Sequence, residues 1–270
     1  MGLQDRIIGI KGAGEMASAI AWRLFSARIQ KLFMMEIETP LAVRRKVSFC
    51  EALYENRHTV EGVQGVKAAG LDAIHQAWAS GRIPVLVDPH WEYASRLSPD
   101  VLVDAVLAKK NLGTHLNEAP LVIGLGPGFT AGRDVHFVIE TQRGHDLGRI
   151  LIQGHAAENT GIPGAIGGFT RERVLRAPAE GIFQTRHDIG ETVRKGEAVA
   201  EVNGKVIRAG VDGVIRGLLR PETPVTPDLK VGDIDPRGRV AYCFTLSDKA
   251  RAIAGSVLEA ICRVYNVDGK

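Results

Sequence analysis

The chain has 270 residues and a formal net charge of +3, with 45% hydrophobic and 24% charged residues. This composition is typical of a globular protein, and the length suits one large domain or two modest ones, of which we expect two. The mild positive charge comes without long Lys/Arg runs or interleaved aromatic residues, so a nucleic acid partner is not expected.

The cysteines and the apolar runs indicate the cellular compartment in which the protein is expected. Cys50, Cys243 and Cys262 lack CxxC or metal-like spacing, so we expect neither a disulfide framework nor a metal site, and we predict a cytoplasmic protein. No apolar run approaches the roughly 18 to 20 residues of a membrane helix, and the N-terminal run is too short for a signal peptide. We therefore expect no membrane partner, while self-association as a homo-oligomer stays open.

Apolar periodicity in the first half predicts alternating strands and helices. The predicted strands have runs of β-branched residues without alternation, which suits strands covered on both faces. We therefore expect a Rossmann-like, doubly wound parallel α/β domain over residues 1–145. The predicted strands are 6–11, 31–38, 83–88, 101–107, 120–125 and 135–140, and the predicted helices are 15–27, 41–55 and 71–80.

Residues 146–270 predict a β-rich domain with a closing helix. From Gly181 short Val/Ile-rich runs are broken by Gly, Asp and Pro at close intervals, and residues 246–264 have helical apolar spacing. The β-rich part resembles the barrel-sandwich fold of biotinyl and lipoyl carrier domains. Its expected hairpin tip, Val211 to Val214, has no lysine, so we expect no biotin or lipoate attachment.

The clearest motif is a G-x-G-x-x-A turn between a predicted strand and a predicted helix. Such a turn brings backbone N–H groups close to a phosphate, and an acidic residue after the next strand meets a ribose hydroxyl. A tight structural turn without a ligand is the alternative, and Glu15 places a negative charge beside the expected phosphate. The candidate cofactor-binding residues here are Gly12, Ala13, Gly14, Ala17, Glu36 and Glu38.

Further cofactor contacts are expected from two later loops and a basic triplet. The loop LGPGFTAGRD contributes Gly126, Gly128 and Thr130, and Lys109 and Lys110 follow the preceding strand. Both loops would serve an anion at the carboxyl ends of the strands, although a mobile loop with surface lysines fits equally well. The triplet 44–46 (Arg-Arg-Lys) is either an extra phosphate contact or a solvated helix face.

Four polar residues close together in the sequence are catalytic candidates: Glu140, Arg143, His145 and His155. A carboxylate, a guanidinium and two imidazoles can orient and protonate a small substrate. A salt-bridged turn with two surface histidines is the alternative. Cys50 is either an exposed sulfur or selenium carrier or a buried small apolar residue.

Several of these stretches, among them KGAGEMASAIAWRL, LGPGFTAGRD, ETQRGHDLGR and KVGDIDPRG, carry a family resemblance. The chain resembles the YqeB-type accessory proteins associated with selenium-dependent molybdenum hydroxylases. The resemblance implies a role in maturing or supplying such a hydroxylase, by analogy with XdhC-type Rossmann accessory proteins that handle molybdenum cofactor. It implies no known reaction and no established catalytic residues.

The function expected from the sequence is accessory work on a selenium-dependent molybdenum hydroxylase. The expected task is to handle the pterin cofactor of the hydroxylase or to insert its labile chalcogen, and the hydroxylase is the expected partner. The expected ligand is a nucleotide-containing or phosphorylated cofactor, either a nucleotide or the molybdenum pterin cofactor, with NAD(P) as the alternative. Two alternatives stay open: an NAD(P)-dependent oxidoreductase, and a non-catalytic docking module.

Overall fold

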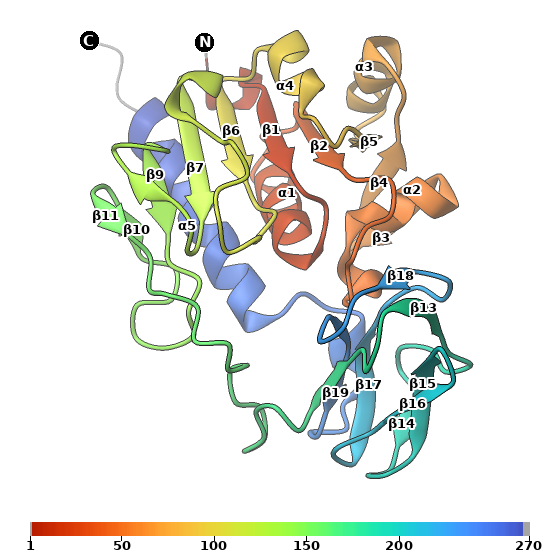
Figure 1. Cartoon of the computed structure of the whole chain (residues 1–270). Coiled ribbons are helices and arrows are strands. Elements are labelled where there is room, and N and C mark those ends of the chain that lie inside the picture. The colour runs from red at the N-terminus through yellow and green to blue at the C-terminus, as the bar shows by residue number, and fades with distance from the viewer. Residues whose placement is uncertain (1, 267–270) are drawn as a thin grey trace. The chain divides into compact units, whose positions relative to one another are not determined.

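The computed structural model describes residues 2–266, which divide into two compact units (Figure 1). Unit 1 comprises residues up to 40, 48–159 and 246 onward, and unit 2 comprises 41–47 and 160–245. The division therefore falls at 159/160 rather than at the expected 145/146. The helix expected to close the β-rich part belongs to unit 1, and a short N-terminal segment belongs to unit 2.

Unit 1 is built on a nine-stranded sheet with the order β10-β9-β7-β6-β1-β2-β5-β4-β3. The pairs from β4 through β9 are parallel, whereas β3 and β10 are antiparallel to their neighbours at the two ends. The strands are β1 (Ile8–Lys11), β2 (Leu32–Glu36), β3 (Arg57–Val60), β4 (Val63–Lys67), β5 (Ile83–Val87), β6 (Val101–Asp104), β7 (Leu121–Leu125), β9 (Phe137–Ile139) and β10 (Ile150–Leu151). A separate two-stranded pair joins β8 (Thr130–Ala131) to β11 (Gly154–His155).

Helices cover both faces of this sheet. On one face, Phe33, Leu86 and Leu102 form a core with α3 (Leu71–Ala79), α4 (Glu92–Leu97) and the segment that follows β7. Alternate strand residues such as Ile10 and Val103 are also fully buried and point to the opposite face. There α1 (Glu15–Ser26) packs against α5 (Asp248–Tyr265).

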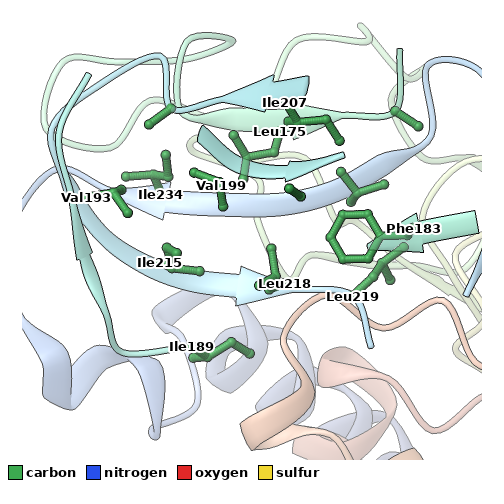
Figure 2. Close-up of a cluster of buried hydrophobic side chains, with 14 of the residues drawn as sticks. Leu175, Phe183, Ile189, Val193, Val199, Ile207, Ile215, Leu218, Leu219 and Ile234 are labelled. Atoms are coloured by element: carbon green, nitrogen blue, oxygen red, sulfur yellow. The ribbon is translucent and has the colours of Figure 1, made fainter. Parts of the chain in front are cut away.

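Unit 2 consists of two four-stranded antiparallel sheets, with the orders β12-β19-β17-β14 and β16-β15-β13-β18. Side chains from both sheets, including Phe183, Val199 and Ile215, meet in one buried cluster (Figure 2). The strands are β12 (Val174–Arg176), β13 (Gly181–Gln184), β14 (Thr192–Val193), β15 (Ala198–Val202), β16 (Lys205–Arg208), β17 (Gly213–Leu218), β18 (Pro224–Val225) and β19 (Lys230–Asp235).

The predicted fold class is wrong, although most predicted strands of the first half are confirmed as elements. The large sheet is mixed rather than a doubly wound parallel sheet, and β5 lies between β2 and β4. No α-helix connects β6 to β7 or β7 to β9; the first connection holds only a short 3-10 turn, Leu116–Glu118, and the second is a glycine-rich loop. The second half consists of antiparallel sheets and is not followed by a helix of its own, so the barrel-sandwich module with a closing helix is also corrected.

Two local predictions are wrong for related reasons. Residues 41–55 were expected to form one helix, but only α2 (Ala52–Glu55) is α-helical, because the segment before it extends into unit 2, where Val43 accepts a hydrogen bond from Leu218. The expected hairpin tip, Val211 to Val214, instead joins β16 to β17, which belong to different sheets; Val211 is buried, Asp212 is exposed and Val214 lies within β17.

Candidate functional site

The glycine-rich turn lies at the carboxyl edge of the sheet, between β1 and α1. Gly12 has a φ of +93°, and its N–H donates to the Met35 carbonyl at 2.7 Å. A Cβ at this position would lie 3.2 Å from the Ala105 carbonyl oxygen. Gly12 is therefore required by the turn and by its close approach to the chain after β6.

Gly14 differs, because nothing in the protein requires a glycine there. Its φ is −71°, which other residues adopt readily, and an added Cβ would meet no atom within 4 Å. Gly14 is also the N-cap of α1, and no side chain caps the helix. The space beside the Gly14 Cβ position, at the amino end of α1, is therefore open to an external acceptor. Ala17, in the first turn, is fully buried.

The carboxylate of Glu36, the last residue of β2, closes the turn. Its two oxygens accept hydrogen bonds from the N–H groups of Ala13 and Ile37, each at 2.8 Å. Burial raises the pKa of Glu36, although these two hydrogen bonds act in the opposite direction. Glu36 thus stabilises the glycine turn through backbone hydrogen bonds, whereas the second candidate, Glu38, is exposed.

The two later loops come together as expected. Gly128 has a φ of +111°, and a Cβ there would lie 2.7 Å from Lys110 Cα, so the two backbones pack directly. Lys109 and Lys110 themselves are exposed. Gly126 packs against Thr141, whose hydroxyl would lie 2.4 Å from an added Cβ. The structure therefore places these lysines beside the second glycine-rich loop.

Thr130 begins β8, at the far end of that loop. Its N–H donates to Asp134 at 2.8 Å, and it pairs with His155 across the short β8–β11 ladder. This ladder holds the end of the loop against the segment 154–155.

A buried polar cluster next to the turn was missed at the sequence level. Lys11, the last residue of β1, is fully buried and donates to Thr114 at 2.7 Å and to Glu118 at 2.8 Å. Thr114 donates in turn to Asp104, the last residue of β6, at 2.7 Å. Burial raises the pKa of Asp104, against the lowering effect of the Thr114 hydrogen bond. The sequence does contain a signal for this cluster, because the apolar strands RIIGIK and VLVD each end with a charged residue, Lys11 and Asp104.

Two of the four catalytic candidates, Glu140 and Arg143, bond to groups outside the candidate set. Glu140 is buried and accepts hydrogen bonds from the N–H groups of Gln142 and Ala157, both at 2.7 Å. Arg143 forms a two-point ion pair with Asp248 at 2.6 and 2.8 Å. His145 and His155 are exposed. Glu140 and Arg143 therefore hold the loop in place.

The basic triplet 44–46 fits neither expectation. Arg44 and Arg45 are buried within unit 2, where Arg44 donates to the carbonyls of Tyr242 and Thr245, and Arg45 to that of Leu218. Arg45 and Lys46 also pair with Asp188. These side chains fasten residues 41–47 to unit 2.

Cys50 is fully buried, and its N–H donates to the Ala13 carbonyl at 3.0 Å. A carrier cysteine needs an exposed thiolate, so the structure favours the buried alternative. Within residues 2–266, no helix combines the length and the apolar character that a membrane span requires.

Comparison with known proteins gives one informative match. No protein-family model matches the chain. The uncharacterized protein YqeB of Escherichia coli (strain K12) is 46% identical over 256 residues, which are 95% of this chain and 47% of that protein. The chain thus spans about half the length of the curated relative it matches, and that relative carries no described activity.

Solved structures resemble the chain only weakly. An aspartoacylase family protein from Mesorhizobium loti has 13% identity, a TM-score of 0.28 and 84% coverage of both chains. TcdA (CsdL) has 12% identity, a TM-score of 0.33, and coverage of 98% of this chain and 90% of its own. A succinylglutamate desuccinylase/aspartoacylase from Rhodobacter sphaeroides has 25% identity and a TM-score of 0.21, over 23% of this chain and 22% of its own.

These scores are too low to assign the fold, which rests on the sheet topology described above. The matched proteins are described as aspartoacylases, a desuccinylase and TcdA, rather than as Rossmann nucleotide-binding or molybdenum hydroxylase accessory proteins. The sheet topology corrects the Rossmann-like classification with a barrel-sandwich hybrid, because the large sheet is mixed and the other sheets are antiparallel.

Proposed function

We propose that unit 1 binds a small phosphorylated molecule at the amino end of α1. One observation carries the proposal: Gly14, the N-cap of α1, has no side chain to cap the helix, and an added Cβ there would meet no atom within 4 Å. The N–H groups and the dipole of a helix amino terminus favour a negatively charged group. α1 has 12 residues, which is long enough for its dipole to contribute.

Neighbouring residues support the same ligand chemistry. Lys109 and Lys110 lie on the loop that packs against Gly128, and their exposed ammonium groups can neutralise a phosphate. Each carboxylate oxygen of Glu36 accepts one backbone hydrogen bond and keeps a second lone pair for a hydroxyl or amine donor. A phosphorylated cofactor that also carries such donors, as phosphorylated pterins do, meets both requirements.

Gly14→Val tests the site. Because φ at Gly14 suits any residue and its Cβ position is open, the variant should fold like the parent while its side chain fills the space beside α1. With inorganic pyrophosphate as the probe, isothermal titration calorimetry should show binding to the parent chain and at least about tenfold weaker binding to Gly14→Val.

The matched control is Gly255→Val in α5, where an added Cβ also meets no atom within 4 Å. This variant should bind pyrophosphate like the parent. The proposal fails if the parent binds no pyrophosphate, or if Gly14→Val binds it as tightly as the parent does.

The cellular task forms a second part of the proposal, and it is supported by the resemblance in sequence. We propose that the chain acts in the cytoplasm in the maturation of a selenium-dependent molybdenum hydroxylase; its three cysteines, all free thiols, fit a reducing compartment. Deleting the gene should lower the molybdenum or selenium content of the hydroxylase purified from the same organism. An unchanged content of both elements would exclude this task.

A further inference from the structure

The loop that carries Lys109 and Lys110 has a strained backbone. Leu107 has a φ of +60° and Lys109 a φ of +63°, in the left-handed region that non-glycine residues rarely adopt. Such conformations persist only where surrounding contacts impose them. The loop between β6 and Glu118 therefore needs contacts with residues outside the loop to keep this conformation.

The contacts that hold it come from the buried polar cluster. Thr114 Oγ1 accepts a hydrogen bond from Lys11 Nζ and donates one to Asp104 Oδ2, each at 2.7 Å. Both partners lie on the sheet, because Lys11 ends β1 and Asp104 pairs with it in register at the end of β6. The Thr114 hydroxyl thus anchors the returning end of the loop to two adjacent strands.

Asn111 links Thr114 to the lysine-bearing part of the loop through hydrogen bonds. Its side-chain oxygen accepts the N–H groups of Gly113 and Thr114 at 2.9 and 2.8 Å, and its amide donates to the Thr114 carbonyl at 2.8 Å. Lys110 directly precedes Asn111, and its backbone packs against Gly128. A fixed Thr114 therefore fixes Asn111, and Asn111 fixes the position of Lys110.

We propose that Lys11, Thr114 and Asp104 form a buried tether that holds Lys109 and Lys110 in place for anion binding. This inference rests on the proposed function. Lys11 Nζ donates to Thr114 and to both carboxylate oxygens of Glu118, so its hydrogens are committed within the protein. Lys11 and Thr114 are positioning residues, and neither contacts the ligand.

Thr114→Val tests the tether, because it keeps the shape of the side chain and removes the hydroxyl. Amide hydrogen exchange should become faster in residues 105–115, and the affinity for pyrophosphate should fall at least about fivefold. Thr114→Ser retains the hydroxyl and should restore both properties. Asn111→Ala, which opens the turn without entering the buried cluster, should act in the same direction as Thr114→Val.

Thr223→Val is the matched control. Thr223 is also buried, and its hydroxyl donates to the Arg220 carbonyl at 2.7 Å within unit 2. It should leave exchange in residues 105–115 and pyrophosphate affinity unchanged, so a general loss of stability is separated from the tether effect.

The two readouts separate the tether from the proposed function. If the parent binds no pyrophosphate, the proposed function fails, and hydrogen exchange still decides whether Thr114 holds the loop. Unchanged exchange in both Thr114→Val and Asn111→Ala overturns the tether. Faster exchange with unchanged pyrophosphate affinity also overturns it, because the loop position would then be irrelevant to binding.

Discussion

Asp233 of unit 2 is a buried carboxylate that neighbouring positive charges keep ionised. It is fully buried on β19 and accepts hydrogen bonds from Arg173 and from Arg216, the latter at 2.5 and 3.0 Å. Burial alone would raise the pKa of Asp233, but the positive charges of Lys230, Arg216 and Arg173 outweigh it and hold the pKa at about 2. The ionised carboxylate is therefore strongly preferred in the folded chain.

This lowered pKa predicts a pH-dependent stability. An Asp pKa held below its usual value of 3.8 stabilises the folded chain above about pH 4, and this contribution is lost as the pH falls through about 2. The difference of nearly two pKa units corresponds to about 2 kcal/mol. Denaturant unfolding should show Asp233→Asn to be less stable than the parent at pH 7, by about 2 kcal/mol or more, because the variant leaves buried arginines without their counter-charge.

Near pH 2 the difference in stability between Asp233→Asn and the parent should shrink, because about half of the parent carboxylates are then protonated. The same destabilisation at both pH values would show that hydrogen-bond geometry, and not charge, accounts for the effect.

Among the connecting elements, the loop after β7 depends on glycine at a point of close backbone contact. Gly128→Ala places a Cβ 2.7 Å from Lys110 Cα at a φ of +111°. Gly132→Ala has a similarly positive φ, +82°, but an added Cβ would meet no atom within 4 Å. Gly132→Ala should cost roughly 1–2 kcal/mol through its backbone alone.

Gly128→Ala should cost more than Gly132→Ala, by roughly 1 kcal/mol or more, because of the overlap with Lys110. It should also weaken pyrophosphate binding, since the overlap moves the lysine loop. Thermal unfolding and calorimetry measure the two effects. Equal stability of the two variants would contradict the direct packing of Gly128 on Lys110.

Elements with a strong period could be predicted from the sequence, and short or irregular ones could not. The apolar strand before Gly12 and the helix after Gly14 are confirmed as β1 and α1. The helix expected over residues 41–55 forms only at its end, as α2, because Arg44 and Arg45 bind distant backbone carbonyls, and local propensity has no information on such contacts. Strands of two residues, such as β10, are too short to show any period.

At the scale of the whole chain, each unit is built from segments that are far apart in the sequence. Residues 246 onward return to unit 1, where α5 packs against α1 and buries Ile253, Val257 and Ile261. The sequence predicted this helix, and its apolar stripe is confirmed. Its partner could not be predicted, because an apolar stripe shows that a helix is buried and does not show against what.

Ending the chain at residue 245 should therefore unfold unit 1. Exposing three buried aliphatic side chains removes roughly 5 kcal/mol or more, which is comparable to the total stability of a domain. Circular dichroism and the loss of dispersed NMR signals would measure the effect. Glu259→Gln changes only an exposed ion pair with Arg263 and should leave stability within about 0.5 kcal/mol. A truncated chain that keeps its cooperative unfolding transition would contradict this role of α5.

The candidate site was likewise predictable only in part. The glycine turn, Glu36 and the two loops could be located because motif spacing and strand ends specify the carboxyl edge of a parallel sheet. The tether through Thr114 could not, since it depends on a contact between residues 103 positions apart. The bonds of Glu140 to the Gln142 and Ala157 N–H groups and of Arg143 to Asp248 could not be predicted either, because closeness in sequence does not fix the direction of side chains in a loop.

The most direct test of the account is a crystal structure of the chain grown with inorganic pyrophosphate. The account predicts density for the anion beside Gly14, with oxygen atoms about 2.9 Å from the first N–H groups of α1. It also predicts that Lys109 or Lys110 faces the anion and that Thr114 keeps its bonds to Lys11 and Asp104. Pyrophosphate bound elsewhere, or an empty space beside Gly14 at saturating concentration, would contradict the central claim.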